Sequence, residues 1–150
     1  MIIKVLPNRI SHKHPELWEL IKFAATSADG IKPEENQAYL NELLHALLCE
    51  RAQCFLKTNK EQTIVKAVII TRLSRNKITE EKFLLLQCYY SFEKSTEKDW
   101  AENMAYAMEF AKQEGCSFIS FESNNSRIIK LAEFFGFRER NRCLDYRFGG

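Results

Sequence analysis

Two long apolar segments in the middle of the chain restrict its possible folds more than any other feature. TIVKAVIITRL (Thr63–Leu73) is rich in β-branched residues, and FLLLQCYYSF (Phe83–Phe92) is almost continuously apolar. Such runs are typical of strands buried on both faces of a sheet. The polar segment Ser74–Lys82 lies between them. We therefore expect an antiparallel pair of central strands joined by a long loop.

The rest of the chain alternates between helical and strand-like patterns. Apolar residues at three- and four-residue spacing predict four helices, which begin at Pro15 and cover Glu34–Arg51, Asp99–Gln113 and Ser126–Phe135. Further strands are expected at Ile2–Leu6, Cys54–Lys57, Cys116–Ser123 and Phe137–Phe148, the last with an alternative hairpin bend near Asn141. The strand–helix–strand unit Phe83–Ser123 predicts a crossover with parallel outer strands. The expected fold is α/β, a mixed sheet of six to seven strands with about four helices on its two faces.

The composition of the chain limits the classes of protein to which it can belong. The chain has 150 residues, of which 45% are hydrophobic, and 22 basic residues stand against 20 acidic ones. This length fits a single domain, 1–150, with a substantial core. No apolar run reaches the roughly 18 residues of a membrane span, and the near-neutral charge argues against nucleic acid as a partner. We expect a soluble, cytoplasmic protein whose oligomeric state the sequence leaves open.

The histidines and cysteines do not predict a metal site. His12 and His14 form an H-x-H pair with no third ligand nearby, and the five cysteines include no C-x-x-C pair. Their odd number and apolar surroundings favour free, buried thiols in a reducing compartment. No metal cofactor is therefore expected.

Arginines gather near the C-terminus. Arg138, Arg140 and Arg142 would share one face of a strand, and Arg147 follows them. Such a face suits an anion or a partner protein. The alternative is a solvated edge strand whose charged side chains prevent pairing with further strands, and we favour this alternative.

The segment AKQEGCSFISFESNNSRIIKLAEFFGF (Ala111–Phe137) carries a more specific pattern. Asn124 or Asn125 is placed to cap the helix that follows it. Gly136 is placed to end that helix in a left-handed conformation before Phe137 returns to the core.

This segment and the order of elements resemble the GNAT superfamily, whose members use acetyl-CoA to acylate amines. The positions in register with the family motif are Gly115-Cys116, Glu122, Asn125, Ile129, Leu131 and Gly136-Phe137. The resemblance implies a GNAT-like fold, acetyl-CoA as acyl donor, and a pantetheine arm bound along the strand around Cys88 to Tyr90. It also implies that Asn125 faces this arm, while helix capping is the alternative role of Asn125.

The chain departs from the family pattern in the loop that should hold the diphosphate of CoA. The family has R/Q-x-x-G-x-G/A there, whereas this chain has STEKDW (Ser95–Trp100). No glycine occurs between Gly30 and Gly115, so no other register supplies the close backbone approach that a phosphate needs. Lys98 remains as a point charge able to meet a phosphate.

The same loop is acidic and is expected to satisfy its own backbone. Its carboxylates are Glu93, Glu97, Asp99 and Glu102. Thr96 and Asp99 approximate a capping box, which occupies N–H groups that an anion would otherwise use.

The catalytic residues of the family are also altered. The tyrosine that protonates the leaving thiolate corresponds to Ala132. Tyr89, Tyr90 and Tyr146 are candidate replacements, with packing in the sheet as their alternative role. Glu122 or Glu93, at strand ends, is a candidate general base, with simple solvation as the alternative. By resemblance, the candidate cofactor-binding residues are Cys88, Tyr90, Ser95, Thr96, Lys98 and Asn125.

Two hypotheses about function follow. The first is an N-acyltransferase that uses an acyl-CoA donor and an amine whose identity the sequence does not define. The second is a non-catalytic structural or interaction protein, similar in general plan to small GNAT-like chains of bacteriophages, some of them virion-associated, with an unidentified protein partner. Binding of acetyl-CoA distinguishes the two.

Overall fold

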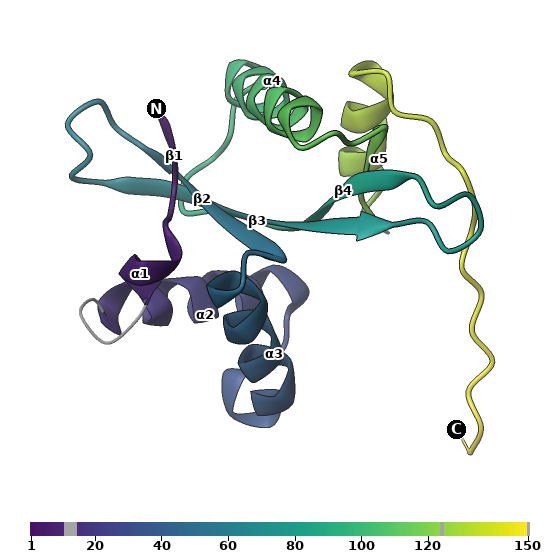
Figure 1. Ribbon diagram of the computed structural model, residues 1–150, viewed down its shortest axis with the longest axis horizontal. Coiled ribbons are helices and arrows are strands. Elements are labelled where there is room, and N and C mark those ends of the chain that lie inside the picture. Colours follow the sequence, from purple (N-terminus) through teal and green to yellow (C-terminus); the bar gives the residue numbers. More distant parts are fainter. Residues whose placement is uncertain (11–14, 124, 150) are drawn as a thin grey trace.

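The computed structural model describes residues 1–10, 15–123 and 125–149, and Figure 1 shows a central sheet between two layers of helices. Its elements are β1 (Ile2–Lys4), α1 (Pro7–Ile10), α2 (Pro15–Asp29), a 3-10 turn (Pro33–Glu35), α3 (Gln37–Leu48), β2 (Ala52–Thr58), β3 (Val65–Arg75), β4 (Lys82–Ser91), α4 (Glu97–Gln113), β5 (Phe118–Ser120) and α5 (Ser126–Phe134). Helices α1, α2 and α3 cover one face of the sheet, and α4 and α5 cover the other.

The five strands are ordered β1-β2-β3-β4-β5. Strands β1 to β4 form an antiparallel meander, and β5 joins β4 in parallel, with Phe83 opposite Phe118 and Leu85 opposite Ser120. The predicted antiparallel pair and the parallel outer strands of the crossover unit are therefore confirmed. Parallel pairing here follows from the α4 connection, because a helical crossover returns the chain in its original direction.

The two sides of the sheet are packed differently. Strand β2 is buried along its whole length, and the α2–α3 side contributes fully buried residues such as Ile21, Leu43 and Leu47. On the other side, α4 buries only Asn103 and Ala111, and no residue of α5 is fully buried. The α4–α5 side is therefore the looser side of the molecule, and the candidate site opens there.

The structure corrects the expected number of elements. The described residues form five strands rather than six to seven, and five α-helices rather than about four, because the short α1 was not predicted. The expected strand Phe137–Phe148 is not formed. These residues lie within the described part of the chain and have no regular secondary structure between 137 and 147. Alternating side chains alone do not make a strand, because a strand also needs a partner for its backbone groups.

Two of the smaller predictions involve residues outside the described part of the chain. These are the H-x-H pair His12 and His14, and Asn124 as a helix cap. The cysteines of the described residues are all free thiols. Within the described ranges, no helix has the length and apolar character needed to cross a membrane.

Candidate functional site

A cleft opens where β4 and β5 diverge. The two strands pair only from Phe83 to Leu85 on β4. Just beyond, the register of β3 with β4 shifts, because Ile70 lies opposite Cys88 while Thr71 lies opposite Leu86. Gln87 is thus the extra residue of a β-bulge, which bends β4. The bend and the short β5 leave a gap in the sheet that no strand of the described residues fills.

The cleft has a volume of about 270 Å³ and is mostly apolar. It extends from the C-terminal end of α2 through the sheet to α4 and α5. Its lining consists of Ala28, Asp29, Ile69, Leu86, Gln87, Cys88, Tyr89, Trp100, Asn103, Met104, Ala107, Phe121, Glu122, Ser123, Ile128, Leu131, Ala132, Phe135 and Phe137. A concave apolar site with a few convergent polar groups is the usual form of a small-molecule site.

A polar pair lies on the α4 wall of the cleft. The Tyr89 hydroxyl lies 2.7 Å from Ser95 Oγ. Asn103 Nδ2 donates to the Tyr89 hydroxyl at 3.3 Å. Asn103 is only 7% exposed, yet its Oδ1 has no hydrogen-bond partner among the described residues. A buried amide oxygen without a partner costs about 1–3 kcal/mol. Asn103 lines the cleft, although this oxygen itself is buried.

Sequence reasoning missed Asn103. The residue follows Trp100 by one helical turn and precedes Met104, so it lies on the apolar stripe of α4. A polar residue within such a stripe was the signal that could have identified it.

The predicted catalytic candidates lie in different places. Tyr89 and Glu122 both line the cleft, together with Ala132, the position at which the resemblance expects a tyrosine. Tyr146 is 85% exposed in the C-terminal segment and does not line the cleft. Of the tyrosine candidates, only Tyr89 lines the cleft with Glu122.

The predicted cofactor-binding residues of β4, Cys88 and Tyr90, face the same side of the sheet, toward α2. Cys88 Sγ donates to Ala24 O at 3.7 Å; Cys88 also lines the cleft, and burial raises the pKa of its thiol to about 12. Tyr90 packs against Phe23 and Phe92, with ring centroids 5.6 and 5.1 Å away, and does not line the cleft.

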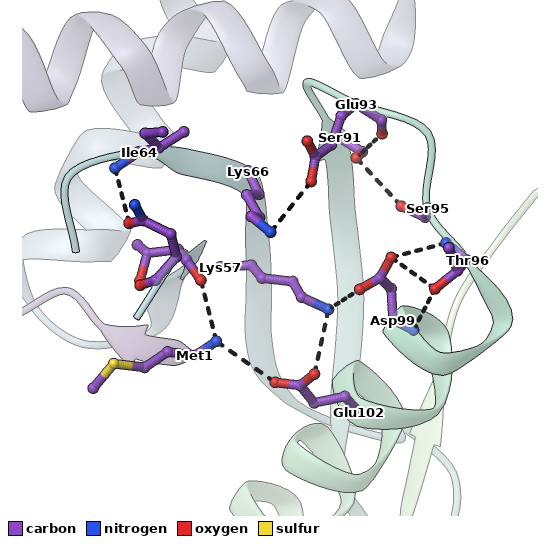
Figure 2. Close-up of polar contacts among 12 residues, drawn as sticks. Met1, Lys57, Ile64, Lys66, Ser91, Glu93, Ser95, Thr96, Asp99 and Glu102 are labelled. Carbon is purple, nitrogen blue, oxygen red and sulfur yellow. Dashed lines mark hydrogen bonds and ion pairs between the residues drawn. The ribbon is translucent and has the colours of Figure 1, made fainter. Parts of the chain in front are cut away.

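The N-terminus of α4 is occupied by the protein's own carboxylate (Figure 2). Asp99 Oδ2 accepts from Thr96 N at 2.8 Å, and Asp99 N donates to Thr96 Oγ1 at 3.2 Å, which confirms the predicted capping box. Lys57 of β2 donates to Asp99 Oδ1 at 2.8 Å and lies 3.6 Å from Glu102. The hydrogen bond from Lys57, with that from Thr96, holds the pKa of Asp99 well below its usual range.

This arrangement does not fit a bound diphosphate. The carboxylate of Asp99 already takes the place and the charge that a phosphate would have at the helix start. Lys98 is exposed and outside the cleft lining, and Ser95 is bonded to Tyr89. Asn125 Oδ1 accepts from Arg127 N at 3.0 Å, so its observed role is that of a cap for α5.

A second polar network reaches the cleft from the α2–α3 side. Gln87, the bulged residue, accepts from Arg72 and donates to the Tyr39 hydroxyl at 3.0 Å. Arg72 also donates to both carboxylate oxygens of Glu42. Burial raises the pKa of Tyr39, so its hydroxyl stays protonated. The network fixes the side chain of Gln87 at the point where the cleft passes through the sheet.

Solved structures resemble this chain over almost its whole length. A probable acetyltransferase covers 99% of the chain and 96% of its own, with a TM-score of 0.71 and 16% identity. A predicted acetyltransferase from Clostridium acetobutylicum, solved with acetyl-CoA, covers 98% and 95%, with a TM-score of 0.71 and 14% identity. The fold is the GNAT acetyltransferase fold.

Other GNAT structures give the same result. The aminoglycoside N-acetyltransferase AAC(6')-Iy in complex with CoA covers 100% of this chain and 95% of its own, with a TM-score of 0.69 and 13% identity. No family model and no curated protein sequence matches the chain. At these identities the comparison establishes the GNAT fold, and the activity has to be argued from the cleft.

Proposed function

We propose that this protein is a GNAT-type N-acyltransferase that binds an acyl thioester of CoA type in the cleft between β4 and α5. The observation that carries the proposal is the unpartnered Oδ1 of Asn103 beside the Tyr89 hydroxyl on an otherwise apolar wall. An unpaired buried acceptor calls for an explanation, and we infer that the Asn103 amide turns into the cleft to meet a ligand.

The residues of the cleft fit the acyl-pantetheine part of such a donor, whereas the start of α4 does not fit its diphosphate. Trp100, Met104 and Leu131 offer apolar surface to an acyl-pantetheine arm, and Asn103 Oδ1 accepts a hydrogen bond from an amide N–H of that arm. The diphosphate does not fit the start of α4, where Asp99 is held by Lys57. We infer that affinity resides in the pantetheine part of the donor.

Two of the titratable groups that line the cleft, Tyr89 and Glu122, suit the two proton transfers of the reaction. The thioester, when bound, supplies the activated acyl group. Glu122 accepts the proton that the amine loses as it forms the new C–N bond. Tyr89 donates a proton to the sulfur as the C–S bond breaks. This is the role of the family's tyrosine, at whose position this chain has Ala132. Ser95 and Asn103 orient the Tyr89 hydroxyl.

The test is calorimetry with acetyl-CoA, followed by thiol release in the presence of a panel of amines. Tyr89→Phe should retain binding and lower kcat by about 10²–10⁴-fold, the usual range for a lost general acid. Tyr106→Phe is the matched control, because Tyr106 lies on α4 and packs against Phe55 rather than in the cleft. Equal loss in both variants would contradict the role of Tyr89.

The second candidate is a non-catalytic GNAT-like interaction protein. Ala132 and the occupied helix start favour it, because both remove features on which acyl transfer in the family depends. This candidate expects neither heat nor thermal stabilisation with acetyl-CoA, and no thiol release with any amine.

A further inference from the structure

The first turns of α4 and α5 lie at the same edge of the sheet. β4 and β5 pair in parallel, and each leads into one of these helices. The cleft opens between the two helix starts, because Trp100 lines it from α4 and Ile128 from α5. In open α/β sheets, ligands bind in the crevice outside the carboxyl ends of such strands. This edge is therefore the entrance through which an acyl donor reaches the cleft.

Unpaired positive charge lies on the outer surface around this entrance. Lys94 lies in the loop before α4 and Lys98 in the first turn of that helix, while Arg127 and Lys130 lie at the start of α5. All four residues are exposed, and none of their charged groups forms an ion pair with another described residue. Together they form a basic rim, which attracts a partner of opposite charge.

Most of the acidic groups beside the basic rim are already paired with lysines of the sheet. Glu93 lies 3.6 Å from a lysine of β3, and Lys57 of β2 lies 2.8 Å from Asp99 and 3.6 Å from Glu102. Glu97 is the exposed acid of the first turn of α4. The paired carboxylates offset little of the charge of the rim, because their own charge is neutralised from the sheet side.

The cations of the rim lie outside the cleft itself. The lining that the described residues provide contains no lysine or arginine. Lys98 precedes Trp100 by two residues and Lys130 follows Ile128 by two, and residues two apart do not share a helix face. Ile129, beside Lys130, is 36% exposed and adds apolar surface. A small ligand within the cleft does not meet these side chains, whereas a folded partner laid across the entrance does.

An acyl-pantetheine thioester reaches an enzyme in one of two chemical forms. In acyl-CoA the arm ends in a diphosphate and a nucleotide, whereas on a carrier protein it ends in a single phosphate bound to a serine. The start of α4, where Asp99 is bonded to Lys57 and Thr96, does not fit the diphosphate of the first form. The second form needs no diphosphate site and replaces the nucleotide by a protein surface.

We propose that the acyl donor is an acidic carrier protein that presents its acyl group on a phosphopantetheine arm and docks on the basic rim, an extension that rests on the function proposed above. The arm enters the cleft between the starts of α4 and α5, and the acidic side chains of the carrier lie against the four cations of the rim. Complementary charge around an apolar centre steers such a partner to the entrance and fixes its orientation there.

The transfer step has the same atoms with this donor as with a CoA thioester. The amine nitrogen forms the new C–N bond as the C–S bond to the arm breaks. Glu122 takes the proton that the amine loses, and Tyr89 supplies a proton to the sulfur. The products are an amide and a carrier protein whose arm ends in a free thiol.

The first test is calorimetry with S-acetylpantetheine, with acetyl-CoA, and with an acyl carrier protein of fatty-acid synthesis whose phosphopantetheine arm is acetylated. The acetylated carrier should bind at least about tenfold more tightly than either small thioester. Its affinity alone should fall steeply with salt, which screens exposed charges. Equal affinities for the carrier and the small thioesters would overturn the carrier proposal and leave acyl transfer standing. Absence of binding by all three probes would overturn both.

The second test reverses charge on the rim. Lys98→Glu combined with Lys130→Glu should weaken binding of the acetylated carrier at least about tenfold and leave that of S-acetylpantetheine unchanged. The matched control is Lys77→Glu combined with Lys112→Glu, because these exposed lysines lie in the β3–β4 loop and the last turn of α4, at the opposite edge of the sheet. The control should bind the carrier as the native chain does. Equal weakening in the two double variants would show that net charge, and not the rim, attracts the carrier, and the proposal would be wrong.

Discussion

Lys57 Nζ lies 2.8 Å from Asp99 Oδ1, although 42 residues separate the two and they come from β2 and α4. Lys57 is only 6% exposed and also lies 3.6 Å from Glu102, which in turn lies 3.7 Å from the amino group of Met1. Figure 2 shows Asp99 and Glu102 on the first two turns of α4, with Lys57 pointing toward both. The pair links α4 to the sheet and places a carboxylate at the helix start.

Replacing Asp99 by alanine should destabilise the protein by about 2 kcal/mol. The change removes the Asp99 half of the capping box, although Thr96 remains as N-cap. It also leaves Lys57 buried with only the more distant Glu102 as a partner, which accounts for most of the loss. Urea unfolding measures the change. Glu97→Ala is the control, because Glu97 lies in the same first turn but is exposed. A loss below about 0.5 kcal/mol, within the usual range for surface changes, would mean that the pair does not hold the helix.

The same carboxylate predicts how stability depends on pH. The pKa of Asp99 is lower in the folded protein than the roughly 3.9 expected for the unfolded chain. As the pH falls below about 3.9, the unfolded state therefore binds more protons than the folded state. The contribution of Asp99 to the unfolding free energy is fully present above about pH 3.9 and is lost as the pH falls towards the folded pKa. The difference in unfolding free energy between the native chain and Asp99→Asn should be constant near neutral pH and should narrow below about pH 4. A difference that persists undiminished in acid would contradict this assignment.

An occupied helix start also predicts which part of the acyl donor is recognised. If the diphosphate has no site, S-acetylpantetheine should bind within about threefold of acetyl-CoA, a difference of less than 1 kcal/mol. The affinity for acetyl-CoA should also depend little on salt, because exposed charge pairs are the ones that salt screens. Calorimetry of both ligands at two salt concentrations tests this. A loss of a hundredfold or more without the nucleotide would place a diphosphate site on the protein after all.

Cysteine reactivity should follow burial and local charge. Arg51 Nε donates to Cys49 Sγ at 3.2 Å, which lowers the pKa of that exposed thiol. Burial raises the pKa of Cys54 and of Cys88 to about 12. Iodoacetamide at mildly alkaline pH should therefore modify Cys49 quickly and the two buried thiols only on unfolding. Peptide mass spectrometry gives the order, and early modification of Cys88 would show that the cleft opens widely.

Much of the fold could be predicted because its signals are local. The β-branched run at Val65–Arg75 and the helical spacing of α4 each determine one element without reference to the rest of the chain. The strand expected at Phe137–Phe148 is the counter-example. Whether an alternating segment becomes a strand depends on a partner edge, and local sequence does not report where that edge is.

Some residues of the candidate site could likewise be predicted from local sequence, and others could not. Tyr89 was predicted as a candidate from its place in the strand before the altered loop, and Glu122 from its place at a strand end. The ion pair between Lys57 and Asp99 depends on the placement of β2 beneath α4, which sequence spacing does not reveal. The unpartnered oxygen of Asn103 is visible only once the packing around it is known.

Asn103→Leu should separate stability from binding. Asn103 is nearly buried, and its Oδ1 is unsatisfied. Leucine of similar size removes this penalty, so the unfolding free energy should stay equal or rise by about 1 kcal/mol. The Tyr89 hydroxyl keeps Ser95 as a partner. Acetyl-CoA affinity should fall about tenfold, the cost of about 1.4 kcal/mol of hydrogen bonding. Asn103→Asp, which keeps an acceptor oxygen, should recover part of this affinity. Loss of stability together with unchanged affinity would mean that Asn103 serves the fold and not a ligand.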